Sequence, residues 1–481
     1  MERLVVDHGV RHSLNRTAAD TGTVGIPHRR ARVLAHAQAA AAIGLTREAL
    51  ARSERSWLSR RWKLPVLAVW TAAWFVILAP GGGIAWNFFL HGSSLLFTGH
   101  LATPGPAGGL HLYANYPQLQ IGPLAFASAA VLRHLGPHDG LVTAELIMTA
   151  MGLVIVYAAE RIALTVRPDL ARSPALQRTL LAGGALFMIA WVELTVAYGH
   201  LDDALALLCA VTALWAAVTN RPGRTGLLVG LAIDAKPWAL IFLPLLLLSG
   251  GRAVTQSGVA AQTRAQVRAW AQVRAWGRVP PWALAAACAL AVTAAGWLPF
   301  FVADPATMTA VHYTIRNMPD SALRAIGFTT ARTPPWDRAA QIIVAWVLGA
   351  LALWRRRGAA VILLAAGARI ALDPGTHGYY TAAVMAGALL WDTLGARRPF
   401  PLWSVLSFCA LNLVPLLTAN AVVRGTIRLD LVIAFTLAVL LGPARWYWQP
   451  APRSESASPA AAHRRGEHPR DHVREVQRQV R

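Results

Sequence analysis

Long apolar runs separated by basic residues constrain this chain more than any other feature of its sequence. Several runs reach about 20 residues, the length that a helix needs to cross the hydrocarbon core of a bilayer. In lipid a backbone must satisfy its own hydrogen bonds, so runs of this kind form helices. Only 14% of the 481 residues are charged, against about 25% in a soluble domain. The sequence therefore predicts an all-α, polytopic transmembrane helical bundle.

The apolar runs predict ten full spans, at residues 64–86, 141–160, 179–197, 204–219, 281–301, 338–354, 358–372, 379–395, 400–420 and 429–447. Two further stretches are too short or too interrupted to cross. Residues 119–135 contain Gly122 and Pro123, and residues 225–249 are broken by Asp234-Ala235-Lys236-Pro237-Trp238. Halves of about 11 residues at 1.5 Å per residue reach little more than half of about 30 Å. We expect a half-span in the first stretch and two half-helices that enter and return in the second, giving about 10–13 membrane segments.

The basic residues orient this bundle. The net charge is +22, and it comes almost entirely from Arg at the ends of apolar runs and in both terminal segments. This pattern favours the positive-inside rule and contact with anionic lipids on the cytoplasmic side, and it does not favour nucleic acid as a partner. We expect a multi-pass plasma-membrane protein with both termini cytoplasmic. Its parts would be a basic, partly disordered segment at 1–63, a membrane domain at 64–447, and a basic, disordered tail at 448–481.

The most unusual polar group is His200-Leu201-Asp202-Asp203, between two predicted spans. A charge at the centre of a bilayer costs roughly 2.5–3.5 kcal/mol on insertion scales, so such groups lie at a surface or face a wet cavity. One interpretation is a polar site at a helix mouth, holding a base or a substrate hydroxyl. The alternative is a solvated turn in which an Asp caps the helix that follows. One Asp would suffice as a cap, so the second Asp and the His favour a functional site.

Two cations also lie in apolar surroundings and need an anion. Lys236 and Arg369 could hold the phosphate of a lipid carrier, or they could pair internally with Asp234 and Asp373. Further polar residues are expected on the same outer side: His377 and Tyr380 after the run that holds Arg369, and Asn87, Tyr113 and Tyr116 in the predicted external loop 87–118. The rings could line a sugar site or form an interfacial aromatic belt.

No soluble-enzyme motif is present: the chain contains no P-loop, no H-E-x-x-H and no G-x-S-x-G sequence. Its three Cys are isolated and form no metal or disulfide pattern. We assign no metal ligand and expect no cofactor. Sugar transfer from a lipid phosphate needs a carboxylate that activates an acceptor hydroxyl and a cation for the leaving phosphate. Both kinds of group are expected on one side of this membrane domain.

Four stretches, in order, resemble the GT-C superfamily of integral-membrane glycosyltransferases, and among them family 87, the polyprenol-phosphate-mannose-dependent mannosyltransferases of actinobacteria. They are Leu112-Tyr113-Ala114-Asn115-Tyr116-Pro117, followed by Gly122-Pro123; Gly199-His200-Leu201-Asp202-Asp203; Ala235-Lys236-Pro237-Trp238; and Leu372-Asp373-Pro374-Gly375-Thr376-His377-Gly378-Tyr379-Tyr380. The resemblance covers roughly residues 64–447.

The resemblance implies a bundle of GT-C type that moves a hexose, mannose first among candidates, from a polyprenyl-phosphate carrier to a lipid or cell-envelope glycan on the outer face. The implied partners are the lipid-linked sugar donor, the acceptor and membrane lipids; the donor is a substrate, and no cofactor is implied. We expect Asp203 or Asp202 as the catalytic base. The substrate-binding residues expected are His200, Lys236, Arg369, Asp373, His377, Tyr380, Tyr113, Tyr116 and Asn87.

One departure from the family bears on the mechanism. Such transferases usually carry a catalytic Asp early in the first external loop, before an aromatic residue, and the matching place here reads Ile84-Ala85-Trp86-Asn87-Phe88. No acid lies between Glu54 and Asp139. Either Asp202 or Asp203 takes that role, or the chain does not transfer sugar. The alternative function is then a non-catalytic relative, or a transporter or flippase of a lipid-linked sugar.

Overall fold

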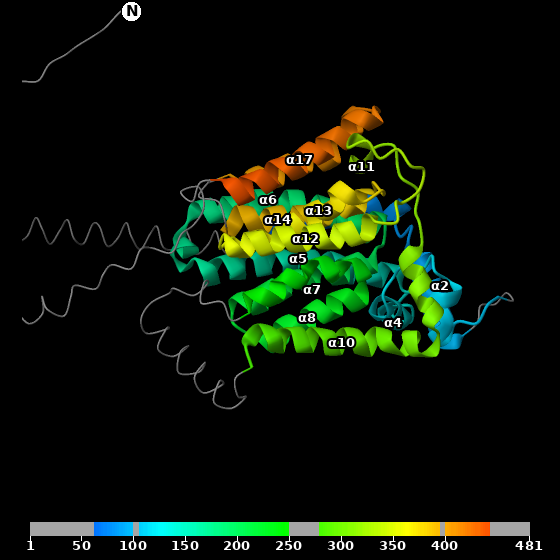
Figure 1. Cartoon of the computed structure of the whole chain (residues 1–481). Helices are drawn as coiled ribbons and strands as arrows, with labels where there is room; N and C mark the ends of the chain where they lie inside the picture. The colour runs from blue at the N-terminus through cyan, green and yellow to red at the C-terminus, as the bar shows by residue number, and fades with distance from the viewer. Residues whose placement is uncertain (1–61, 100–104, 250–278, 395–399, 443–481) are drawn as a thin grey trace, which may run out of the picture. The chain divides into compact units, whose positions relative to one another are not determined.

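The computed structural model describes residues 62–99, 105–249, 279–394 and 400–442 (Figure 1), so the predicted terminal segments lie almost wholly outside the described residues. Within these ranges there is no β-strand, only an isolated bridge between Arg316 and Arg332. After a first helix, Trp62–Gly81, the α-helices are α2 (Trp86–Thr98), α3 (Leu112–Asn115), α4 (Pro123–Leu132), α5 (Leu141–Val166), α6 (Pro174–Val192), α7 (Leu201–Val218), α8 (Pro222–Ala235), α10 (Pro281–Ala303), α11 (Ala322–Ala325), α12 (Asp337–Trp354), α13 (Val361–Leu372), α14 (Thr381–Leu394), α15 (Leu402–Phe408), α16 (Val414–Leu417) and α17 (Ala421–Leu441).

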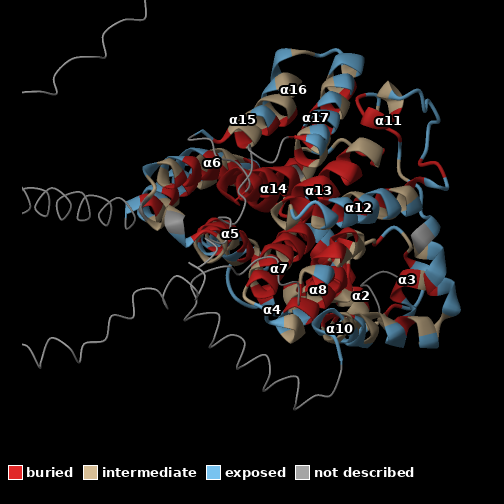
Figure 2. Cartoon of the chain, turned by 60° about the vertical axis from the view of Figure 1, so that its left-hand side comes forward, coloured by how far each residue is buried: buried red, intermediate tan, exposed pale blue. Residues whose placement is uncertain are grey.

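The longer helices lie side by side along a common direction, and α2 and α4 gather at one end of them (Figure 1). Figure 2 shows the buried residues concentrated in α7, α13 and α14. Every residue of α14 is buried, which makes this helix the centre of the bundle. By contrast, only 11% of the residues in an apolar 18-residue stretch of the first helix are buried, and only 17% in the corresponding stretch of α10. These two helices therefore turn apolar surface outward.

Six described helices are long and apolar enough to cross a membrane: Trp62–Gly81, Leu141–Val166, Pro174–Ala197, Leu201–Val218, Pro281–Ala303 and Asp337–Trp354. The prediction of an all-α membrane bundle is confirmed at this level. The expected count of ten full spans is not reached within the described ranges. The apolar helices Gly358–Leu372, Thr381–Leu394 and Leu402–Leu417 have fewer than 18 residues. The first two are largely buried within the bundle.

The last predicted span also differs from the structure. We expected residues 429–447, of which 443–447 lie outside the described residues. Helix α17 begins earlier, at Ala421, and includes Arg424 and Arg428. Both arginines face Asp320, at 3.6 Å and 3.9 Å from its Oδ2. A carboxylate from a distant loop therefore compensates charges that the apolar pattern alone excludes from a span.

The two interrupted stretches form short helices, as predicted. Helix α4 has 10 residues and starts at Pro123, which needs no N–H partner at a first helical position. Helix α8 ends at Ala235, and the 3₁₀ helix η5 (Pro237–Leu248) follows. The break between these two helices lies at Lys236, within the sequence that interrupted the apolar stretch.

The two halves of the second stretch run in opposite directions. Gly226 and then Gly230 of α8 lie against successive turns of α10, so α8 runs in the same direction as α10, toward the end that carries α2. Pro244 and then Leu248 of η5 lie against Gly349 and Gly358, so η5 follows α12 back toward the other end (Figure 1). The expected reversal of direction between the two halves is therefore present.

Candidate functional site

The site lies at the connection between α6 and α7. A π-helical turn, η4 (Glu193–Ala197), ends α6, and Gly199 follows with φ +68°. A Cβ at Gly199 would lie 3.1 Å from the backbone of Gly83, so both the conformation and the space favour glycine. The chain then turns into α7, whose first turn carries Asp202 and Asp203, where the helix dipole favours negative charge.

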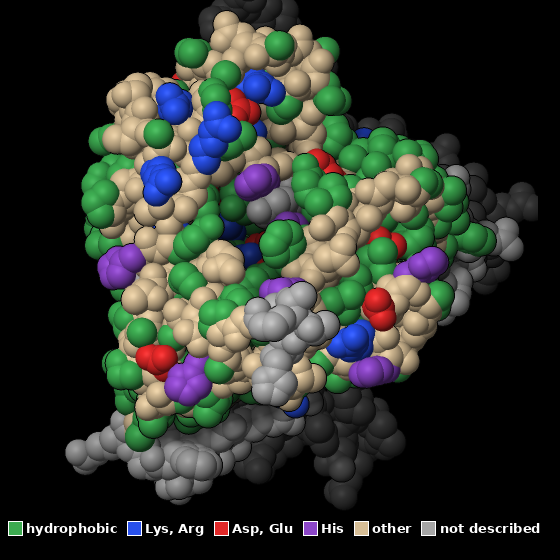
Figure 3. Space-filling model, turned by 90° about the vertical axis from the view of Figure 1, so that its right-hand side faces the viewer, with side chains coloured by type: hydrophobic (Ala, Val, Ile, Leu, Met, Phe, Trp, Pro, Cys, Tyr) green, Lys and Arg blue, Asp and Glu red, His purple; other side chains and the backbone are tan. Residues whose placement is uncertain are grey.

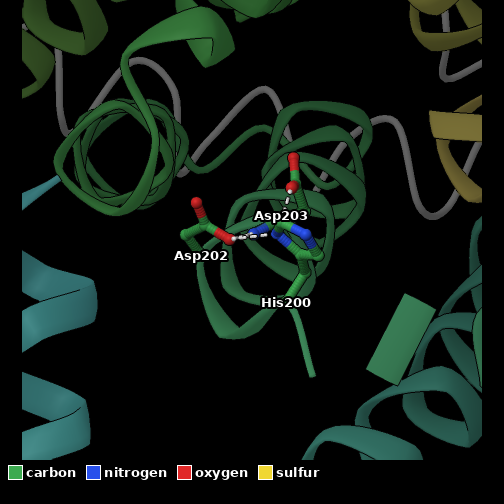
Figure 4. A group of neighbouring side chains, drawn as sticks. All are labelled: His200, Asp202 and Asp203. Carbon is green, nitrogen blue, oxygen red and sulfur yellow. Dashed lines mark hydrogen bonds and ion pairs between the residues drawn. The ribbon is translucent and has the colours of Figure 1, made fainter. Parts of the chain in front are cut away.

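The two aspartates do not form a solvated capping turn. Asp202 and Asp203 are 0% and 3% exposed, and the cap position is His200, which makes no side-chain capping bond. The Asp202 carboxylate instead accepts the backbone N–H of its neighbour at 2.8 Å. Figure 4 shows the three side chains as one group; His200 Nδ1 lies 3.4 Å from one oxygen of each aspartate. The capping alternative is therefore wrong, because it required exposed carboxylates.

Lys236 joins this group from the break between α8 and η5. Its ammonium pairs with Asp202 and lies 3.6 Å from Asp203 Oδ2. Burial lowers the pKa of Lys236, but the two carboxylates outweigh burial and hold that pKa above its usual value, so the side chain stays charged. The expected alternative partner, Asp234, makes no such pair among the described residues: Lys236 turns toward α7, and Asp234 turns toward α10.

Arg369, on α13, approaches from the other side. Its Nη1 lies 3.8 Å from Asp203 Oδ1, and its Nε lies 3.4 Å from Asp373 Oδ2. The expected Arg369–Asp373 pair is present, and Asp203 shares the same guanidinium. The guanidinium carbon lies 4.1 Å from the ring centre of Trp238 and 4.3 Å from that of Tyr380. Two aromatic faces and two carboxylates thus fix one planar cation.

The segment after α13 completes the site. Asp373 Oδ1 accepts the backbone N–H of Gly375 at 2.7 Å, which fixes the turn. The His377 ring lies 5.7 Å from Tyr380, edge to face. Burial lowers the pKa of His377, so this side chain is neutral near pH 7. We call the following residues the ion cluster: His200, Asp202, Asp203, Lys236, Arg369, Asp373, His377 and Tyr380.

Three predicted binding residues lie elsewhere. Tyr113 and Tyr116 pack into a second apolar cluster with Phe126 and Phe300. Their hydroxyls donate to the backbone carbonyls of residues 121 and 106, each at 2.8 Å. The predicted external loop 87–118 is itself partly helical, with α2 and α3, and Asn87 is exposed on α2. These hydroxyls are occupied because the loop folds back onto its own apolar side chains.

Two aromatic residues of the site were not predicted as binding residues. Trp238 Nε1 donates to Asp203 Oδ1 at 2.7 Å, in addition to stacking on Arg369. Its place two residues after Lys236 was the available signal. The Phe89 ring, from α2, lies 6.5 Å from His200, edge to face. Nothing in the sequence marks Phe89 apart from the other aromatics of its segment.

A second charged network, around Asp320, lies next to the ion cluster and holds the segment after α13 in place. Thr376 Oγ1 donates to Asp320 Oδ1 at 2.7 Å. The backbone N–H of Met318 donates to the carbonyl of Pro374 at 2.9 Å. With the α17 arginines on Asp320, these bonds tie the segment after α13 to the loop before α12 and to α17.

His200, Asp202 and Asp203 are also close enough together to be considered as metal ligands, since their ligand atoms lie within 4.8 Å of one another. The Lys236 ammonium already lies against both carboxylates, so a metal ion would have to displace it. The donor set therefore fits an internal ion cluster better than a metal site.

The end of the bundle that carries α2 and α4 is hollowed. Figure 3 shows this face, with basic and acidic side-chain atoms visible in the depth of the hollow and histidines around it. Comparison with protein-family models, with curated proteins and with solved structures finds no match. The function must consequently be inferred from the geometry of the ion cluster and from the sequence motifs that form it.

Proposed function

We propose that this chain is an integral-membrane glycosyltransferase of GT-C type, which moves a hexose, mannose first among candidates, from a polyprenyl-phosphate carrier to a lipid or cell-envelope glycan. The observation that carries the proposal is the convergence of three of the four motif stretches. Segments around residues 200, 237 and 373 each contribute charged or aromatic groups to one ion cluster. A chain that kept these motifs only as lipid-interface signals would not need to bring them together.

Lys236 and Arg369 are the groups proposed for the donor phosphate. Both are cations fixed by carboxylates, Lys236 by the aspartates of α7 and Arg369 by Asp203 and Asp373. Preorganised cations stabilise the charge that develops on a leaving phosphate without a cost in reorganisation. Tyr380 and His377 border Arg369 and are the groups proposed for the sugar ring.

Asp202 and Asp203 take a positioning role in this proposal. Asp203 faces Trp238, Lys236, Arg369 and His200 at once. Two of these four groups, Lys236 and Arg369, are cations that approach the carboxylate from different elements. We therefore assign the α7 aspartates to holding the two cations, and not to accepting the proton of the acceptor hydroxyl.

The test is sugar transfer in membranes of an expressing host, with labelled polyprenyl-phosphate-mannose and several acceptor lipids. Arg369→Lys keeps the charge but loses the planar stack on two rings. We expect it to weaken donor binding about tenfold, which is about 1.4 kcal/mol, within the range of a desolvated cation–π contact. Arg332→Lys, at an exposed position of the isolated bridge, is the matched control and should match wild type.

The outcomes separate the two candidate functions. Labelled glycolipid from wild type, reduced in Arg369→Lys and unchanged in Arg332→Lys, supports a transferase. Donor binding by purified protein without any new glycosidic bond points to the non-catalytic relative or the flippase. The absence of any Asp or Glu from residues 55–138 favours this alternative. Equal transfer by all three proteins would remove Arg369 from the donor site.

A further inference from the structure

Asp234 is a buried carboxylate that the ion cluster does not use. Its residue is 6% exposed, and its Oδ1 has no hydrogen-bond partner within the described part of the chain. None of the ion pairs found among the described residues includes it. An uncompensated buried carboxylate is costly, and an ionisable group inside a membrane protein marks a functional site by default.

The Asp234 carboxylate lies against α10. It faces Gly296 on α10, where a Cβ would lie 2.6 Å from Oδ1 and 2.8 Å from Oδ2. Any other residue at 296 would push the carboxylate away. Glycine at this position therefore keeps space for the Asp234 side chain between α8 and α10.

An unused donor lies beside this unused acceptor. Trp297 follows Gly296, and its buried indole N–H has no partner among the described residues. The Trp297 ring packs 4.8 Å from that of Tyr113. Burial and the nearby Asp234 carboxylate raise the pKa of the Tyr113 phenol, so Asp234 lies in the neighbourhood of the tyrosine that Trp297 contacts. A hydroxyl can donate to a carboxylate and accept from an indole N–H, so this pair fits an alcohol.

The position of Asp234 relative to Lys236 suggests what Asp234 and Trp297 could do. The two residues stand on either side of the break where α8 ends. Lys236 turns to the aspartates of α7, while Asp234 turns to α10. The tip of the α8–η5 pair thus presents a cation on one side and, on the other, a carboxylate that pairs with no cation of the described segments. That is the arrangement needed for a phosphate donor on one side and a hydroxyl acceptor on the other.

We propose that Asp234 binds the reacting hydroxyl of the acceptor and takes its proton. This inference rests on the proposed function. In the step, the acceptor oxygen forms a bond to the anomeric carbon of the donor sugar, and the bond between that carbon and the phosphate oxygen breaks. The phosphate leaves with the electron pair, held by Lys236 and Arg369, and the acceptor proton passes to Asp234. The acceptor class is an uncharged alcohol, the hydroxyl of a sugar or polyol.

The experiment compares wild type with Asp234→Asn and Asp234→Glu in two assays. One measures binding of labelled polyprenyl-phosphate-mannose to purified protein, and the other measures transfer to acceptor as a function of pH. Asp430→Asn, at an exposed carboxylate on α17, is the matched control. A general base contributes about 10²–10⁴-fold. We expect Asp234→Asn to lose about 100-fold or more in transfer while donor binding stays within about twofold, and Asp234→Glu to retain activity with a displaced pH profile.

Donor binding distinguishes a chemical role of Asp234 from a structural one. Intact donor binding by Asp234→Asn shows that the variant is folded, so lost transfer then supports the inference. Transfer by Asp234→Asn within a few-fold of wild type overturns it. Loss of donor binding together with transfer also overturns it, because Asp234 would then act on the donor or on the fold. Absence of transfer by wild type and by Asp430→Asn, with every acceptor, contradicts the proposed function itself and is thereby distinguished from a failure of Asp234 alone.

Discussion

At the scale of single residues, the ion cluster is held together by buried carboxylates that pair with buried cations. Asp202 is fully buried, and Lys236 is its cationic partner. Breaking a buried pair leaves a charge without compensation, which costs far more than the pair contributes when it is intact. The pair therefore makes a clear prediction about stability, independent of any substrate.

We predict that Lys236→Met lowers the free energy of unfolding by about 3–5 kcal/mol, because it leaves Asp202 buried without its cation. Adding Asp202→Asn to this variant should restore a large part of the loss. Thermal unfolding in detergent measures both. Strictly additive losses in the double variant would contradict direct coupling between the two side chains.

The neutral His377 predicts a dependence on pH. Its folded pKa lies below the ordinary value of 6.5 because burial outweighs the attraction of Asp373 and Asp320, while His200 and Arg369 also oppose its protonation. The unfolded chain then binds more protons than the folded chain as the pH falls through about 6.5. Folding stability from this group is present above that pH and is lost below it.

We expect wild type to lose more thermal stability between about pH 7.5 and about pH 5.5, the window set by an ordinary His pKa, than His377→Gln does. The measurement is the unfolding temperature of each protein across this range. Parallel curves for the two proteins would show that His377 titrates alike in the folded and unfolded chains.

At the scale of elements, the α8–η5 pair is positioned by a close backbone approach. The N–H of Gly122, just before α4, donates to the carbonyl of Ala235 at 3.0 Å. A Cβ at Gly122 would lie 2.6 Å from the carbonyl carbon of Asp234 and 2.8 Å from that of Ala235. These are backbone atoms, which cannot turn aside as a flexible side chain can. Helix α4 therefore sets the position of the tip that carries Lys236.

We predict that Gly122→Ala destabilises the fold by about 1–3 kcal/mol, the usual cost of overpacking, and reduces donor binding by shifting Lys236. Gly122 has an ordinary extended conformation, with φ −73° and ψ 156°, so the collision alone accounts for the effect. Gly223→Ala on α8 is the control, because a Cβ added at Gly223 would have no neighbouring atom within 4 Å. Equal stability of both variants would show that α4 does not fix the tip.

At the scale of the whole molecule, the arginine run after α12 predicts how the bundle is oriented in the membrane. One end of α12 leads into Arg355, Arg356 and Arg357, while the other end belongs to the face with the hollow. Basic residues beside spans remain on the cytoplasmic side. We therefore expect the ion cluster to open to the outer face, where a lipid-linked sugar and an envelope glycan can meet.

This orientation is tested by cysteine accessibility, in a variant without Cys209, Cys288 and Cys409. We expect Ile326→Cys, exposed after α11, to react with a membrane-impermeant maleimide in intact cells. Arg355→Cys, at the end of α12, should react only after the membrane is permeabilised. The reverse pattern would place the hollow on the cytoplasmic side.

The sequence alone determined the class of fold and the position of its breaks. Apolar runs near 20 residues require helices in lipid, and the stretches around Gly122 and residues 234–238 form short helices in the structure, of 10 residues in α4 and 14 in α8. It also singled out Asp202, Asp203, Lys236 and Arg369, because charges in apolar runs are costly wherever the chain folds.

Only the tertiary structure decided which of these groups are partners. Local spacing offered Asp234 for Lys236, but the partner is Asp202, 34 residues away. Spacing also offered Tyr113 as a binding residue, but its hydroxyl is taken by a backbone carbonyl and its ring by an apolar cluster. The apolar pattern along the chain shows which charged side chains are energetically costly to bury. The partner that offsets this cost depends on helix packing, which brings distant segments into contact and gives Asp234 no cation from the described helices.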